Sequence, residues 1–255
     1  MNKFKSKSLL ASFPILILFL LTSCASRKNI AYFQNAKNYE TQQVNTETFA
    51  PKFKVGDILG INVSALDRET TVPFNLVTGT GDNAQSLDYI VDKEGNIEFP
   101  VLGKIRLLGL TPTEAKELLR ERISEYVKNP IINLRLTNFQ ITVLGAVNRP
   151  GRYAVVGERI TLIEALGLAG DLTIQGERRN ILVQRDFNGT KTWSRVDLTT
   201  KDIVDSPLYY LTQNDLVYVE PNKGTIRSSG LDAVDTLIIS LSSSAVFLII
   251  AVLTR

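Results

Sequence analysis

Apolar and polar residues follow two kinds of spacing between residues 51 and 220. Short runs in which they alternate predict β-strands, and two segments with apolar residues three and four positions apart predict α-helices. Each helix is expected to begin with a capping box, formed by Thr111 with Glu114 in one and by Thr161 with Glu164 in the other. The pattern predicts an α+β fold of two small units, 51–138 and 139–220, each with a mixed sheet around one capped helix.

The spacing also places the individual elements. In the first unit, a strand at 58–63 leads through a long loop at 64–88 to a hairpin that pairs 89–91 with 97–99. The helix is expected to end at Asn129-Pro130 and to bury one apolar face, made of Ala115, Leu118, Leu119, Ile123, Tyr126 and Val127. In the second unit, a short helix that ends at Gly170 is expected among strands at 141–147, 153–156, 181–185, 193–198 and 216–219.

The N-terminus has the pattern of a secretion signal. Lys3, Lys5 and Lys7 form a basic start, and the apolar run at 9–21 is shorter than the roughly 20 residues that span a bilayer. The run ends in Leu-Thr-Ser-Cys, which resembles a bacterial lipobox, so we expect a signal peptide at 1–23 and acyl chains such as palmitate on Cys24. The alternative is a free Cys at the edge of a membrane anchor. Residues 24–50 are polar and predict a lipidated tether.

A second membrane signal lies at the C-terminus. Residues 236–254 contain no charged side chain, and a helix of this length, at about 1.5 Å per residue, nearly matches a hydrocarbon core of about 30 Å. We predict a spanning helix after a linker at 221–235, and a buried core helix is the alternative. The first half of the helix places Thr236, Ser240 and Ser243 on one face with Ser244 beside it, which suits a pore lining or helix packing. Both imply neighbouring helices and therefore an oligomer.

Composition excludes several kinds of chemistry. The chain has 255 residues with no His and one Cys, so histidine-dependent catalysis, intrachain disulfides and Cys or His metal sites are excluded. The lysines of the signal peptide account for the whole formal charge of +3. A neutral remainder without a basic run is unsuited to nucleic acid. We predict no catalytic residue, no metal site and no cofactor.

A few side chains remain as functional candidates. Paired carboxylates are the main enzyme chemistry left, but the acidic residues mostly lie in turns or at strand starts, where Asp bonds to its own backbone. Tyr209 and Tyr210 are candidate sugar contacts, as are Tyr218 and Trp193, because aromatic rings stack on sugar rings. Half-buried packing in strands is the alternative for these aromatic residues.

Two sets of strings carry a resemblance to a known family. The first unit contains VGDILGINV, YIVDKEGNIEFPVLGKIRLLGLTPTEAKELL and NPIINLRL, and the second contains ITVLGAVNRPGRYAV, TLIEALGLAG, LVQRD and LTQNDLVYVEPNK. In these strings the two units resemble the polysaccharide-export domain and the soluble-ligand-binding β-grasp (SLBB) domain of the polysaccharide-export outer-membrane lipoproteins. Where that family often has Ala-Gly-Gly after the second helix, this chain has Ala169-Gly170-Asp171, and Asp also tolerates the left-handed conformation.

The resemblance implies a conduit for export of capsular or exopolysaccharide, without enzyme activity. Family members form rings, often octameric, that are lipid-anchored to the outer membrane with their body in the periplasm. The implied partners are further copies of the chain, the exported polysaccharide and an inner-membrane co-polymerase, often a tyrosine autokinase. Two other hypotheses are a monomeric glycan-binding lipoprotein that acts as an envelope scaffold and a glycan hydrolase that relies on carboxylates alone.

Overall fold

The computed structural model describes residues 30–36, 49, 51–79, 85–187, 189–225 and 241. Its contacts divide the chain into one compact unit, Tyr32–Glu220, and a second unit made of the two terminal segments, Met1–Ala31 and Pro221–Arg255. Cys24 and the predicted segment 236–254, apart from Leu241, lie outside the described residues. Among the residues that are described, no helix has the length and apolar character needed to cross a membrane.

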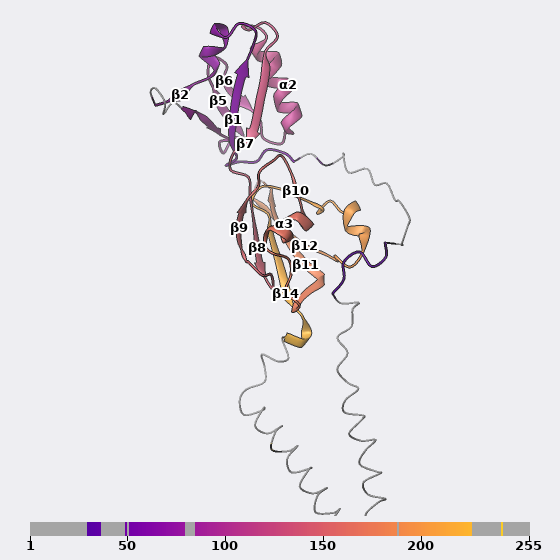
Figure 1. Ribbon diagram of the computed structural model, residues 1–255. Helices are drawn as coiled ribbons and strands as arrows, with labels where there is room; N and C mark the ends of the chain where they lie inside the picture. The colour runs from indigo at the N-terminus through magenta and orange to yellow at the C-terminus, as the bar shows by residue number, and fades with distance from the viewer. Residues whose placement is uncertain are drawn as a thin grey trace, which may run out of the picture. The chain divides into compact units, whose positions relative to one another are not determined.

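Two separate clusters of buried apolar side chains lie within Tyr32–Glu220. One draws its fully buried members from Phe53 to Leu134, and we call residues 51–136 the first lobe. The other draws them from Phe139 to Val219, and we call residues 138–220 the second lobe. The mixed α+β character predicted from the spacing is confirmed, since each lobe combines strands with one α-helix (Figure 1).

The main sheet of the first lobe has three antiparallel strands. β1 (Ile58–Ser64) lies between β4 (Asp88–Ile90) and β7 (Ile131–Leu136). Buried side chains alternate along β1 and face those of β7, because Ile61 is paired with Leu134 and Val63 with Ile132. The helix α2 (Pro112–Ile123) contacts β7 and completes the core.

The first capping box forms as predicted. The Glu114 backbone N–H donates to Thr111 Oγ1 at 3.2 Å, and the Thr111 N–H donates to Glu114 Oε2 at 2.7 Å. The expected apolar face is correct for Ala115, Leu119, Ile123 and Val127, which are buried, whereas Leu118 is partly buried. It is wrong for Tyr126, which is 56% exposed, because the helix ends at Ile123 and the next residues leave the helical spacing.

The predicted hairpin has different strand partners in the structure. β4 pairs with β1, and β5 (Asn96–Phe99) pairs with β6 (Gly103–Arg106). The chain reverses after Pro100 because Val101 and Gly103 adopt positive φ angles of 67° and 72°. The predicted long loop holds a 3₁₀ helix, η2 (Glu69–Phe74), and the short strands β2 (Val77–Thr78) and β3 (Gln85–Ser86).

The second lobe is built on a five-stranded mixed sheet. Its order is β12 (Thr190–Val196), β11 (Gly176–Phe187), β14 (Leu216–Pro221), β8 (Gln140–Gly145) and β9 (Gly151–Ala154). β14 runs parallel to β8, whereas the β11–β12 and β8–β9 pairs are antiparallel. A separate pair, β10 (Ile160–Thr161) with β13 (Tyr210–Leu211), and the 3₁₀ helix η4 (Lys201–Asp205) complete the lobe.

The helix α3 (Leu162–Leu168) packs against β8 and has the predicted capping box. It ends in a Schellman motif, in which the Asp171 N–H donates to the Leu166 carbonyl and the Gly170 N–H to the Gly167 carbonyl. Gly170 and Asp171 have φ angles of 73° and 68°, so Asp171 does adopt the left-handed conformation.

Part of the segment predicted as a tether is described. The Phe33 N–H donates to the Leu198 carbonyl at 3.2 Å, and the Gln34 N–H donates to the Thr199 carbonyl at 2.7 Å. Tyr32 and Phe33 pack against the core of the second lobe. Residues 32–34 are therefore attached to this lobe.

Candidate functional site

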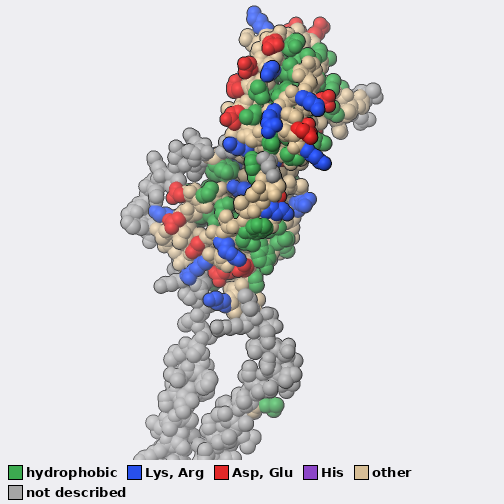
Figure 2. Space-filling view, turned by 180° about the vertical axis from the view of Figure 1, so that it is seen from behind, with side chains coloured by type: hydrophobic (Ala, Val, Ile, Leu, Met, Phe, Trp, Pro, Cys, Tyr) green, Lys and Arg blue, Asp and Glu red, His purple; other side chains and the backbone are tan. Residues whose placement is uncertain are grey.

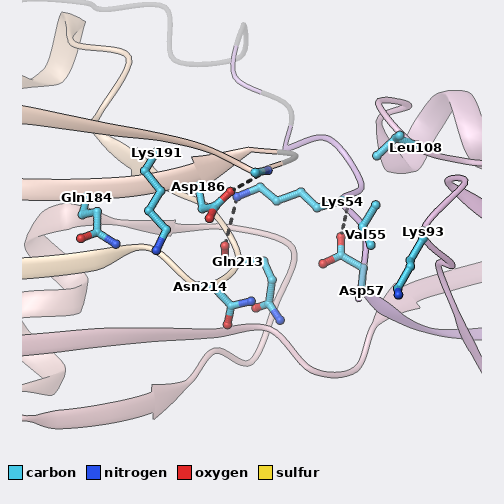
Figure 3. A pocket seen from close by; sticks show the side chains of 11 residues that line it. Lys54, Val55, Asp57, Lys93, Leu108, Gln184, Asp186, Lys191, Gln213 and Asn214 are labelled. Atoms are coloured by element: carbon cyan, nitrogen blue, oxygen red, sulfur yellow. Dashed lines mark hydrogen bonds between the residues drawn. The ribbon is translucent and has the colours of Figure 1, made fainter.

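A cleft of about 730 Å³ is lined by residues of both lobes (Figure 3). The first lobe contributes the segment around Lys54 and Asp57 and the turn that leads into β5. The second contributes the end of the β11–β12 pair and the turn before β14. The lining residues are Lys54, Val55, Asp57, Lys93, Leu108, Gln184, Asp186, Gly189, Lys191, Gln213 and Asn214.

Lys54 connects the two lobes at the floor of this cleft. Its residue is 8% exposed, and its Nζ donates to Thr212 Oγ1 at 2.8 Å and to the Gln213 carbonyl at 3.1 Å. Burial lowers the pKa of Lys54, and the nearby Asp215 carboxylate opposes that shift. Since a buried ammonium group needs acceptors, these contacts fix the first lobe to the turn before β14.

That turn is held by the buried carboxylate of Asp215. Asp215 is 0% exposed and accepts hydrogen bonds from the Thr212 N–H at 2.8 Å, Thr212 Oγ1 at 3.0 Å and Arg185 Nη2 at 2.8 Å. Arg185 also donates to the Tyr210 carbonyl at 2.8 Å. The turn is therefore preorganised by a charge pair.

Two amide side chains extend the connection. Gln213 accepts from the Gln140 N–H at 2.7 Å and donates to the Asn138 carbonyl at 2.7 Å. Asn138 in turn accepts from the Ile58 N–H at 2.9 Å and donates to the Gly56 carbonyl at 3.1 Å. A continuous path of hydrogen bonds joins β1, the junction of the lobes and the cleft.

The carboxyl group of Asp57 lies close to the same connection. It is 2% exposed, and its Oδ2 accepts from the Lys54 N–H at 2.8 Å. Burial raises the pKa of Asp57 to about 6, although the Lys54 backbone hydrogen bond and the Lys54 charge both act in the opposite direction. Asp57 is therefore engaged with the protein backbone and not with the open part of the cleft.

The remaining polar side chains of the lining are more accessible. Lys93 and Lys191 are exposed, and neither forms an ion pair with an acidic residue in the part of the chain that is described. Figure 3 shows Gln184, Asp186 and Lys191 on one side of the cleft and Lys93 on the other. Gln184 Oε1 accepts a hydrogen bond of 3.2 Å from the indole N–H of Trp193, which is 60% exposed. The cleft thus offers ammonium and amide donors beside an exposed aromatic ring.

The predicted sugar contacts Tyr209 and Tyr210 do not line this cleft. Tyr210 is 9% exposed; the Phe49 ring stacks on it at 5.1 Å and the Arg159 guanidinium lies 5.1 Å from its centroid. Tyr209 meets it edge to face at 5.0 Å. These contacts favour packing, and a sugar contact at Tyr209 and Tyr210 stays a prediction. The other predicted site residues, Cys24, Thr236, Ser240, Ser243 and Ser244, lie outside the described residues.

The sequence pattern does not indicate Lys54, Lys93, Lys191 or Gln213 as site residues. Lys54 and its acceptor Thr212 are 158 positions apart, so no local spacing connects them. Trp193 is a candidate from the sequence only because an aromatic ring can stack on a sugar ring. Within the described ranges, no group of three or more Asp, Glu, Cys or His side chains is placed to hold a metal ion.

Residues 46–137 match the family described as polysaccharide biosynthesis/export protein. Over these residues, the chain is similar to the polysaccharide-export family. The matched residues contain the whole first lobe, including the cleft residues Lys54, Asp57 and Lys93. The second side of the cleft, with Gln184 and Lys191, lies beyond the matched residues.

Curated relatives carry names that agree with this polysaccharide-export family. The chain is 31% identical over 140 residues to the EPS I polysaccharide export outer membrane protein EpsA of Ralstonia solanacearum, which is 53% of this chain and 36% of that protein. It is 23% identical over 187 residues to the capsule polysaccharide export outer membrane protein CtrA of Neisseria meningitidis serogroup A, which is 69% of this chain and 46% of that protein. The chain therefore spans between about a third and a half of the length of these relatives.

Proposed function

We propose that this protein is an outer-membrane lipoprotein that takes part in the export of capsular or exopolysaccharide and has no enzyme activity. The observation that carries the proposal is the family match over residues 46–137, together with relatives named as polysaccharide export outer membrane proteins. The lipobox-like sequence before Cys24 agrees with an anchor in that membrane and a body in the periplasm.

Within this proposal, the chain acts as one subunit of a ring that forms a conduit. Apolar side chains are exposed on the segment between β1 and β4, where Leu66 is 103%, Val72 66% and Val77 60% exposed. A surface of this kind is stabilised when it is covered by another subunit. The apolar segment 236–254, with Thr236, Ser240, Ser243 and Ser244 on or beside one face, would supply the membrane part.

The two lobes would have separate roles in such a conduit. The first is a polysaccharide-export domain, and the second is β-grasp-like, since it has a five-stranded mixed sheet around one helix, α3. Figure 2 shows Lys and Arg side chains interspersed with Asp and Glu over the face in view. The implied partners remain the polymer and an inner-membrane co-polymerase with tyrosine autokinase activity.

The experiment is deletion of the gene in its own host, with surface and periplasmic polysaccharide measured separately. Export without this protein should fail, so polymer should disappear from the surface and the full chain should restore it. A chain truncated after Pro221 should remain lipid-anchored and fail to restore export. Normal surface polymer in the deletion strain would contradict the proposal, and export by the truncated chain would remove the C-terminal segment from the conduit.

A monomeric glycan-binding scaffold is the second candidate function. It is favoured by one observation, the exposed Trp193 beside a cleft that offers amide and ammonium donors. A scaffold should be a monomer after gentle extraction in detergent, whereas a conduit subunit should remain in a large particle. The size of the extracted particle separates the two candidates.

A further inference from the structure

We infer that the cleft between the two lobes binds a segment of an anionic saccharide, with Lys93 and Lys191 on its acid groups and Trp193 on a sugar ring. The inference rests on the proposed function for the choice of a saccharide as the ligand. It goes further by assigning a site, a charge class and the residues that recognise it.

The charge of the accessible lining favours an anion. Lys54 is engaged with Thr212 and Gln213, and the Asp57 carboxyl group is buried against the Lys54 backbone. Among the exposed or partly exposed side chains, Lys93 and Lys191 are cations and Asp186 is an acid. Two accessible lysines against one accessible carboxylate leave a net positive charge facing the cleft.

The two cations approach from different elements. Lys93 lies in the turn before β5, and Lys191 lies on β12 as the cross-strand partner of Asp186. In Figure 3 their side chains stand on opposite sides of the lining. A ligand that carries acid groups at intervals, as a polymer of acidic sugars does, can meet both ammonium groups, whereas a small anion can meet only one.

The aromatic contribution comes from Trp193, which is paired with Gln184 across the β11–β12 strands. Its indole N–H donates to Gln184 Oε1 at 3.2 Å, and Gln184 lines the cleft. This bond orients a ring that is 60% exposed, and a large exposed ring with an anchored polar end can bind the apolar face of a sugar. Gln184 and Asn214 supply amide groups that can bond sugar hydroxyls.

The size of the cleft agrees with a short saccharide segment. Its volume of about 730 Å³ lies within the range of about 300–1,000 Å³ that is usual for small-ligand sites. Because the lining comes from both lobes, and Lys54 holds them together, the two sides of the site are fixed relative to the Thr212–Asp215 turn.

Trp193 is the one tryptophan of the chain and is bonded to the lining residue Gln184, so its fluorescence reports on the strand pair beside the cleft. The full chain in detergent is titrated with a galacturonic acid hexamer, with maltohexaose as a neutral hexamer and with inorganic phosphate. We expect a saturable change in Trp193 fluorescence with the acidic hexamer. Maltohexaose lacks the acid groups for two charge-assisted contacts, so we expect its affinity to be weaker by about ten-fold or more. Phosphate can meet only one ammonium group and has no sugar ring for Trp193, so we expect no response to it.

A double variant tests the residues. Lys93→Gln with Lys191→Gln should weaken binding of the acidic hexamer by about ten-fold and leave the weak binding of maltohexaose unchanged. The matched control is Lys104→Gln with Lys128→Gln, which removes two exposed lysines that do not line the cleft and should leave both affinities unchanged. All four positions are exposed, so neither variant disturbs a core.

The inference is overturned by no binding of the acidic hexamer, by equal affinity for maltohexaose, or by an equal loss of affinity in the control variant. A response to phosphate alone would replace the saccharide site with a simple anion site and also overturn it. The proposed function is judged separately by surface polymer in the deletion strain. A chain that restores export but does not bind the acidic hexamer contradicts the cleft assignment alone.

Discussion

The pair Arg185–Asp215 should contribute most of the stability of the turn that meets Lys54. Arg185 Nη2 lies 2.8 Å from Asp215 Oδ2, with the two side chains 18% and 0% exposed. Arg185→Met keeps much of the side-chain stem but removes the charge. The variant leaves a fully buried carboxylate without its main partner, and breaking a buried pair in this way costs about 3–5 kcal/mol.

The contacts that remain place the expected loss at the lower end of that range. Asp215 keeps the hydrogen bonds from the Thr212 N–H at 2.8 Å and Thr212 Oγ1 at 3.0 Å, and the charge of Lys54 remains nearby. Arg185 also loses its bond of 2.8 Å to the Tyr210 carbonyl. We therefore expect Arg185→Met to lower the free energy of unfolding by about 3 kcal/mol.

The assay is urea unfolding of the full chain in detergent, followed by Trp193 fluorescence. With a slope of about 2 kcal/mol per molar urea, the midpoint should fall by about 1.5 M. The matched control is Arg195→Met. The nitrogen–oxygen distance in the Arg195–Glu220 pair is similar, at 2.9 Å, but its side chains are 49% and 33% exposed. The control should lose between 0 and about 1 kcal/mol. Equal losses in the two variants would refute the argument from burial.

Three further predictions follow from single residues. The pKa of Asp57 is raised from 3.8 to about 6, so its contribution to stability is present below about pH 4 and is lost as the pH rises through 6. Asp57→Asn keeps an acceptor for the Lys54 N–H and should remove this pH dependence. Urea unfolding between pH 4 and 7.5 should then lack a change of up to about 3 kcal/mol in the free energy of unfolding. An unchanged pH profile would contradict the burial argument. Leu119→Ala should lower the free energy of unfolding by about 2–5 kcal/mol, and Leu118→Ala by clearly less, because Leu119 is fully buried and Leu118 is partly buried. Thermal unfolding measures both losses, and equal losses would refute this helix face. Cys24→Ala should abolish acyl labelling and leave a slower-migrating precursor, and normal labelling would rule out the lipobox.

The features that sequence predicted well are local. Both capping boxes depend on residues three positions apart, and Thr111 with Glu114 and Thr161 with Glu164 bond as expected. The left-handed conformation of Asp171 agrees with the expectation that Asp tolerates it in place of Gly after the second helix.

The predictions that were wrong concern the partners of strands and the end of a helix. The turn at Asp92–Gly95 exists, with the Gly95 N–H donating to the Asp92 carbonyl, but the strands beside it pair elsewhere. β4 pairs with β1, which lies about thirty positions earlier, and periodicity does not choose among distant partners. The apolar spacing predicts a core position for Tyr126 because the spacing continues past Ile123, where the helix ends.

The cleft could not be predicted from spacing because each of its sides comes from a different lobe. Lys93 and Lys191 are ordinary exposed lysines in the sequence, and only the fold places both in one lining. The similarity to the polysaccharide-export family covers residues 46–137 and does not indicate this site, because the second side of the cleft lies beyond the matched residues.

The central claim is that several copies of this chain form a conduit for polysaccharide. Single-particle imaging of the full-length protein, extracted gently in detergent, tests it most directly. The account predicts a closed ring of several copies around a central cavity. A monomer that survives the same extraction at every protein concentration would contradict the conduit and favour the glycan-binding scaffold.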